Sequence, residues 1–168
     1  GVAMNSRNMW RGNAAGLGGF TCSLTWGISG THTAPRIFVG LAASTSLIID
    51  AADPSASTNI VGFGVDAGES TLRVMTNDAS GTATKTDLGA NYPITSGVFY
   101  EFFLHAEPNG SAVEYYIRRL DTAFATGGTL STDLPSNTSF LALQAGLDTA
   151  GATEAVTVGA TVSAAANA

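Results

Sequence analysis

Cysteine is nearly absent from this sequence of 168 residues, in which Cys22 stands alone. A single cysteine excludes an intrachain disulfide and every zinc site built from two or four cysteine ligands. Phe20 and Leu24 lie two residues to either side of Cys22, and Trp26 continues the same alternation. This period of two is typical of a half-buried strand, so we expect Cys22 to be a small buried hydrophobe rather than a reactive thiol.

Basic residues and long apolar runs are also scarce. Lysine and arginine together number 7 against 13 acidic residues, which gives a formal net charge of −6. A nucleic-acid partner would require clustered basic side chains to neutralise its phosphates, so the composition argues against one. No apolar run approaches the roughly 18 residues that a membrane-spanning helix needs, and we expect no membrane insertion.

Small residues, by contrast, are abundant: the chain has 27 alanines, 21 threonines, 20 glycines and 15 serines. This composition favours strands and turns, and the chain is long enough for one domain with its own core. Residues 1–19 are polar and glycine-rich and are predicted to form an N-terminal arm or linker. Residues 20–168 are predicted to form a single β-sandwich domain.

Short apolar runs separated by turn residues follow one another through that domain. Eleven runs are predicted as strands: 20–28, 36–42, 46–50, 59–65, 70–76, 83–88, 98–106, 112–120, 127–132, 140–146 and 154–162. Such spacing is the pattern of an antiparallel sandwich or barrel. No apolar stripe at helical spacing is sustained, so the sequence predicts an all-β fold with at most one or two helical turns.

One hairpin can be predicted in detail. Asn109-Gly110 tolerates the positive φ of a type I′ turn and joins the runs 98–106 and 112–120. The resulting register pairs Leu104 with Tyr115, Phe102 with Ile117, Glu101 with Arg118 and His105 with Glu114. Apolar pairs then share one face and opposite charges share the other, which is the arrangement that register selection favours.

Three aromatic residues fall on the charged face of this hairpin: Phe99, Phe103 and Tyr116. In a two-layer sandwich the opposite face points into the core, so these rings would otherwise form an exposed patch. We therefore expect them to lie in an interface. The cover is either another part of the same chain, such as the arm 1–19, or a neighbouring subunit.

Two further turns, at 66–69 and 77–81, predict a three-stranded meander of the runs 59–65, 70–76 and 83–88. Pro93 lacks the donor that a central strand requires, so the segment that follows the meander is expected to be a loop.

Catalytic constellations are scarce. His32 lies in a loop-like segment, and His105 is expected to form a structural cross-strand pair with Glu114. No Gly-x-Ser-x-Gly nucleophile elbow is present. Asp66 and Glu69 share one short turn, where acidic residues are usually turn formers rather than calcium ligands. We therefore expect a protein that is not an enzyme and holds neither a metal nor a cofactor.

Sugar binding is the more serious local hypothesis, because flat carbohydrate sites combine exposed aromatic rings with polar side chains on a rigid scaffold. Candidate residues are Trp10, Trp26, Tyr92, Asn77, Asp78 and Asn91. Trp26 alternates in phase with core residues and is expected to be buried. Tyr92 precedes a proline in a loop and is expected to be more exposed.

Several segments, taken in order, resemble a domain found in tail fibres and appendage proteins of tailed bacteriophages. They are RIFVGL at 36–41, NIVGFG at 59–64, MTNDASGTATK at 75–85, DLGANYP at 87–93, VFYE at 98–101, EPNGS at 107–111 and GTLSTDLP at 128–135. The resemblance covers about residues 20–160, and it depends on order and spacing because each motif is short.

This resemblance implies a jelly-roll or lectin-like sandwich at the outer end of a virion appendage. It also implies a homotrimer, contact with a host-surface receptor or glycan, and a virion location, and it transfers no catalytic residue. Two other roles stay open: a capsid decoration, cement or head-fibre protein, and a carbohydrate-binding module that is either cellular or attached to an enzyme.

Overall fold

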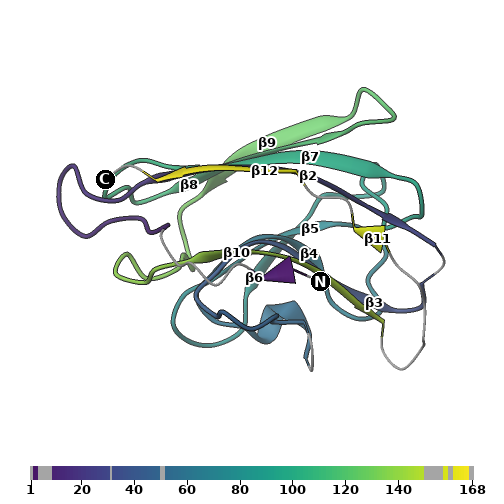
Figure 1. Cartoon of the computed structure of the whole chain (residues 1–168), viewed down its shortest axis with the longest axis horizontal. Coiled ribbons are helices and arrows are strands. Elements are labelled where there is room, and N and C mark those ends of the chain that lie inside the picture. The colour runs from purple at the N-terminus through teal and green to yellow at the C-terminus, as the bar shows by residue number, and fades with distance from the viewer. Residues whose placement is uncertain are drawn as a thin grey trace.

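The chain folds as two antiparallel β-sheets packed face to face (Figure 1). The computed structural model describes residues 2–3, 9–30, 32–49, 52–149, 157–158 and 161–166. Within these residues the helical structure is one short 3-10 turn, η1 (Pro54–Ala56). The predicted all-β sandwich is confirmed. The described part of the chain has no helix long and apolar enough to cross a membrane.

The first sheet has six strands in the order β1-β10-β3-β4-β5-β6. Its strands are β1 (Val2–Ala3), β3 (Pro35–Ala42), β4 (Ile60–Val65), β5 (Arg73–Asn77), β6 (Thr84–Asp87) and β10 (Ala142–Thr149). The predicted meander is confirmed as β4, β5 and β6, which pair consecutively.

The second sheet has the order β11-β2-β7-β8-β9, with β12 also paired to β2. Its strands are β2 (Phe20–Ser29), β7 (Phe99–Ala106), β8 (Val113–Arg119), β9 (Ala125–Leu130), β11 (Thr157–Val158) and β12 (Thr161–Ala166). The predicted hairpin register is confirmed, since Leu104 lies opposite Tyr115 and Glu101 opposite Arg118. Alternation of apolar and polar residues, with a two-residue period, is what holds this register.

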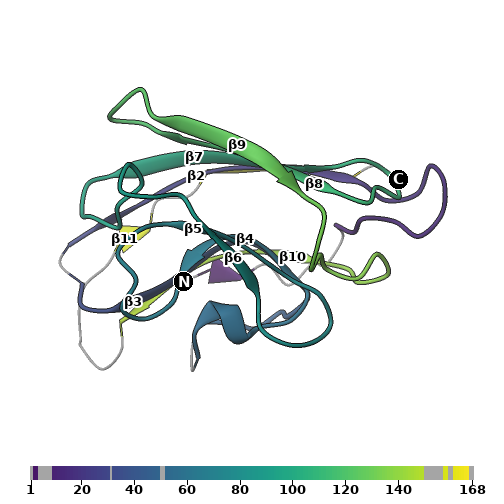
Figure 2. The same cartoon turned by 180° about the vertical axis from the view of Figure 1, so that it is seen from behind.

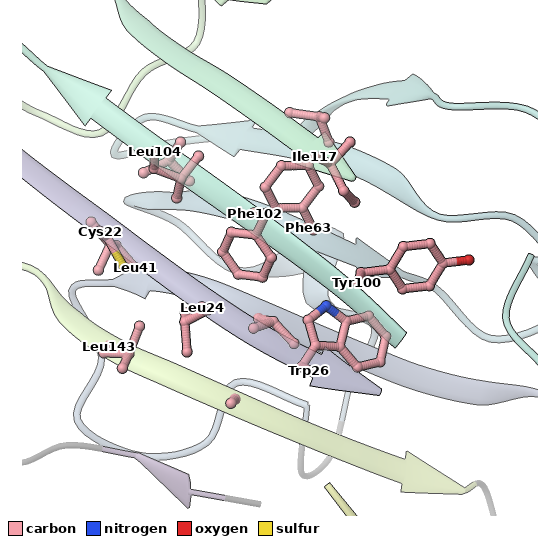
Figure 3. Close-up of a cluster of buried hydrophobic side chains, with 14 of the residues drawn as sticks. Cys22, Leu24, Trp26, Leu41, Phe63, Tyr100, Phe102, Leu104, Ile117 and Leu143 are labelled. Atoms are coloured by element: carbon pink, nitrogen blue, oxygen red, sulfur yellow. The ribbon is translucent and has the colours of Figure 1, made fainter. Parts of the chain in front are cut away.

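The main core fills the space between the sheets. Figure 3 shows Phe102 and Trp26 of the second sheet pointing toward side chains of the first, and the ring centroids of Phe63 and Phe102 are 4.6 Å apart. Cys22 belongs to this core and is fully buried, as predicted. Burial raises the pKa of the Cys22 thiol to about 12, which keeps the thiol protonated and unreactive at neutral pH.

A second, smaller cluster covers the outer side of the first sheet. The segment that contains η1 lies beneath this sheet in Figure 1 and Figure 2, on the side away from the second sheet. Phe38, Met75 and Ile49 form part of the cluster. Ile49 was expected in a strand at 46–50, but residues 46–49 form a loop that lays Ile49 over Gly146, where an added Cβ would meet the Ile49 side chain at 2.7 Å. The apolar run 46–49 is thus a loop that covers the outer side of the first sheet and is not a strand of it.

The predicted arm is partly built into the sandwich. β1 pairs with β10, and Met9 bridges to Leu141 and is buried. Arg11 donates from Nε to the Pro135 carbonyl at 3.0 Å and from Nη1 to the Gly110 carbonyl at 2.9 Å. The domain boundary after residue 19 stays a prediction. The predicted strand 154–162 lies largely outside the described residues, which show β11 and the start of β12 there.

Candidate functional site

Trp10 and Phe140 form an aromatic pair at one end of the first sheet. The antiparallel bridge between Met9 and Leu141 brings the two aromatic residues opposite each other. Their rings stack with centroids 5.1 Å apart and planes inclined by 27°. Phe140 is 49% exposed and Trp10 is half-buried, so the pair presents a ring surface to solvent.

The aromatic pair lies on the outer side of the first sheet. Leu141 and Leu143 point into the core between the sheets. Phe140 is in step with Ala142, which belongs to the outer cluster. Because side chains alternate along a strand, the Phe140 ring projects away from the second sheet.

A pocket of about 520 Å³ opens among the loops on this side. Its lining residues are Ala43, Ser44, Ile48, Ala56, Ser57 and Thr58. Three of these residues, Ser44, Ser57 and Thr58, carry hydroxyl groups, and Ile48 gives the space an apolar side. The Ser44 hydroxyl donates to the Ser46 carbonyl at 2.9 Å. The pocket lies at the same end of the sheet as the aromatic pair. Ala42 of β3 pairs with Ala142 of the antiparallel strand β10. Ser44 follows Ala42 by two residues and Phe140 precedes Ala142 by two, so both lie past the same end of this strand pair.

Two buried side-chain amides fix the walls of this pocket. Gln144 is 1% exposed; its Nε2 donates to the carbonyls of Ser44 and Ser46 at 2.7 and 2.9 Å, and its Oε1 accepts from Ile48 N at 3.2 Å. On the other wall, Asn77 Nδ2 donates to the Ser57 carbonyl at 2.7 Å. These hydrogen bonds preform the loops, so a ligand would pay little ordering entropy.

The predicted sugar-binding residues do not form one exposed site. Tyr92 is 4% exposed because its ring packs against Tyr100, with centroids 6.2 Å apart, so its expected exposure is wrong. Asn77 is fully buried and acts as the wall support described above. Asp78 accepts hydrogen bonds from Ser80 N and Oγ and shapes a turn.

Asn91 lies at the opposite end of the sandwich from Trp10. It is exposed, and its carbonyl accepts a hydrogen bond from Arg119 Nη1 at 3.2 Å. Trp10 is tied to the start of β2 by the bond from Gly19 N to its carbonyl, whereas Tyr92 packs at the start of β7. Since β2 and β7 are antiparallel, these positions mark opposite ends. Sequence reasoning found Trp10 and missed Phe140, its partner.

His105 was expected to pair with Glu114. The register is right, but the hydrogen bonds run elsewhere: Nδ1 lies 2.9 Å from Thr21 Oγ1, and Nε2 lies 3.2 Å from Glu107 Oε1. Glu107 reaches the ring because it follows β7 in the turn. A shallow space of about 280 Å³ adjoins His105, lined also by Glu107, Gly110, Ser111, Ala112 and Glu114.

The turn carboxylates are held by cations. Lys85 Nζ lies 2.6 Å from Asp66 Oδ2 and 2.7 Å from Glu69 Oε1. Burial acts to raise the pKa of Asp66, but hydrogen bonds from Lys85 and Ser55, with the Lys85 charge, outweigh it and leave that pKa below its ordinary value. The described residues hold no group of three or more His, Cys, Asp or Glu side chains that could bind a metal ion.

The outer face of the second sheet carries the predicted interface aromatics. Phe99, Phe103 and Tyr116 are 39%, 38% and 42% exposed, and the last two rings are 6.3 Å apart. Arg118 Nη2 donates to Glu101 Oε2 at 2.8 Å on the same face. The prediction that these three aromatic residues share one exposed face of the sheet is confirmed. The partner that would cover it stays a prediction.

Comparison with known proteins finds similarity at the level of structure only. No family model matches the sequence, and no curated protein matches it. Among solved structures, peanut lectin superposes with a TM-score of 0.62 at 12% identity, covering 94% of this chain and 76% of the lectin. Lectin II from Ulex europaeus gives 0.63 at 12% identity, covering 95% and 78%. Alginate lyase A1-II′, of polysaccharide lyase family 7, gives 0.53 at 14% identity, covering 97% and 66%.

The fold is a lectin-like jelly-roll sandwich. The predicted fold class is therefore confirmed. At identities of 12–14% the likeness concerns the arrangement of strands, and it includes both lectins and a lyase. Function must be argued from the residues of this chain.

Proposed function

We propose that this domain is a non-enzymatic module that binds a glycan at the Trp10–Phe140 end of the first sheet. The observation that carries the proposal is a partly exposed aromatic pair at the same end and on the same side as a preformed pocket lined by two serines and a threonine. A sugar ring has an apolar face of C–H groups that packs on an aromatic ring and a rim of hydroxyls that exchange hydrogen bonds with polar groups. The similarity of the fold to that of lectins supports the proposal.

We extend the proposal to the biological setting that the sequence resemblance implies, a bacteriophage tail fibre or appendage that contacts a host-surface glycan from the virion. The segments between residues 36 and 135 that resemble the phage domain, in the same order along the chain, support it. The parent open reading frame tests it directly. A fibrous region beside this domain is the expected finding, whereas an adjacent glycosidase domain would identify an enzyme-attached carbohydrate-binding module.

The glycan site is tested by measuring the affinity of purified protein for oligosaccharides selected on a glycan array. We expect Phe140→Ala and Trp10→Ala each to weaken binding about twofold to tenfold, since loss of a stacking ring removes about 0.5–1.5 kcal/mol. Phe103→Ala, at an exposed ring on the other sheet, is the matched control and should bind normally. Undiminished binding by both site variants would contradict the proposal. Turnover of the bound glycan would contradict its non-enzymatic part.

A further inference from the structure

β9 forms an uncovered edge of the second sheet. In the described part of the chain it pairs with β8 alone and ends the strand order β11-β2-β7-β8-β9. Figure 2 shows β9 along the outer border of the second sheet. Its residues, Ala-Thr-Gly-Gly-Thr-Leu, are all exposed or half-exposed, and none is charged or proline.

The backbone groups that face outward can be assigned from the register. Arg119 N donates to the Phe124 carbonyl at 2.9 Å, which makes these two residues a hydrogen-bonded pair. In an antiparallel ladder such pairs alternate with non-bonded ones. Ala125, Gly127 and Thr129 are therefore the non-bonded members, and their N–H and C=O groups point away from β8 toward the open side.

The edge of the first sheet on the same side of the sandwich carries charged side chains, and β9 does not. Edge strands in native proteins usually carry charges or are capped, which prevents pairing with other chains. β6, the edge of the first sheet, carries Lys85 and Asp87, and its Thr84 N donates to Asp133 Oδ2 at 2.8 Å. β9 carries neither a charge nor a proline, so its outward backbone groups can pair with another strand.

We propose that β9 pairs antiparallel with β9 of a second copy of this chain, about a two-fold axis at Gly127. This register sets Ala125 opposite Thr129 of the second copy and glycine opposite glycine, so small side chains meet without a clash. Phe124, which is 44% exposed, then lies on the same side as Leu130 of the second copy and directly opposite it. The segment is its own complement in shape, and it opposes no charges between two chains that each carry −6.

This pairing joins the two second sheets into one continuous sheet and is independent of glycan binding. A closed two-fold contact satisfies both edges at once and leaves no further β9 edge for growth. It also differs from the trimer expected at the face of Phe99, Phe103 and Tyr116, because the contact runs along the edge and not across the face.

A disulfide trap tests the register. In the double variant A125C/T129C, each new cysteine would lie opposite its counterpart in the second copy, at a Cα separation of about 5.5 Å that suits a disulfide. We expect mild oxidation to give a covalent dimer on a non-reducing gel. Thr129→Cys alone is the control, since its two copies would lie about 13 Å apart along the strands. Equal cross-linking of both variants, or of neither, would overturn the proposal. Cys22 is buried and stays outside the trap.

Light scattering at micromolar concentration provides a second readout that does not depend on new cysteines. We expect a mass twice the chain mass of 17.0 kDa for the wild type and the single-chain mass for Ala125→Lys/Thr129→Lys, which sets lysines opposite each other. Thr86→Lys/Ala90→Lys adds the same charge at an exposed position of β6 and in the turn that follows it, and this variant should remain dimeric. A wild-type monomer, a trimer, or a dimer that survives the β9 lysines would each overturn the proposal.

Discussion

At the scale of single residues, two loop aromatics show what sequence could and could not establish. Tyr92 was expected on the surface, but its carbonyl accepts from Leu72 N at 2.8 Å and its ring lies on Tyr100. Phe140 falls inside the predicted strand 140–146, where alternation gives no sign that it is the exposed half of the aromatic pair. Its stacking partner, Trp10, lies 130 positions earlier, and local alternation carries no information about such a partner.

Asp66 supplies a prediction about acid stability. Its pKa is depressed, so the ion pair with Lys85 contributes stability above the ordinary pKa of 3.8, and this contribution is lost as the pH falls through the lower folded-state value. We expect Asp66→Asn to cost about 1–3 kcal/mol at pH 7, because the largely buried carboxylate loses its charge-assisted hydrogen bond with Lys85. Urea unfolding at pH values from 7 to 2 measures both quantities.

The decline of the unfolding free energy between pH 5 and pH 2 should be smaller in Asp66→Asn than in the wild type. Glu107→Gln is the control, since the Glu107 side chain is 79% exposed. An Asp66→Asn curve parallel to that of the wild type would show that the ion pair is not the titrating element. Part of the slope should persist, because the pKa values of Asp87 and Asp133 are lowered as well.

At the scale of elements, the sequence predicted most strands because alternation, turn residues and cross-strand pairing agree with one another. The hairpin of β7 and β8 shows this best. Its register is predicted from the Asn109-Gly110 turn, the apolar pairs on one face and the opposite charges on the other. The run 46–50 failed because an apolar stretch can cover a sheet as well as belong to one. Gln144 holds that cover in place, and a glutamine in an apolar strand gives no sequence signal of its role.

Gln144 therefore supports a prediction at this scale. We expect Gln144→Ala to lower the free energy of unfolding by about 1–3 kcal/mol, because three backbone groups of the loop lose their partner. The amide of Ile48 should exchange with deuterium faster than in the wild type, and glycan affinity should fall as the pocket wall loosens. Hydrogen exchange with mass spectrometry measures the exchange rate of the Ile48 amide, and urea unfolding measures the loss of stability.

Asn137→Ala removes an exposed amide in a neighbouring loop and is the matched control for Gln144→Ala. It should leave both the stability and the exchange of the Ile48 amide unchanged. If Gln144→Ala kept the wild-type exchange rate at Ile48, the loop would owe its order to Ile49 and not to the amide.

At the scale of the whole molecule, the spacing of short strands predicted a sandwich, yet the strand order could not be predicted. Local patterns specify neighbours joined by short turns, such as β4, β5 and β6. They do not specify that β10 enters between β1 and β3, because that position depends on which distant edges fit together after the sheets form. The position of β10 is therefore the part of the fold that the sequence predicts least well.

The placement of β10 also has a consequence in time. β3 and β10 pair across about 100 residues of chain, and closing such a loop costs about 4 kcal/mol in entropy, against about 2 kcal/mol for a short hairpin. We expect the hairpin of β7 and β8 to form early and the first sheet to be completed late, by insertion of β10. Pulsed hydrogen exchange during refolding should protect amides of β7 and β8 before those of β10. Simultaneous protection would contradict this order. Until β10 has been synthesised and has paired, β3 exposes an open edge, so the newly made chain is open to mispairing at that edge throughout this interval.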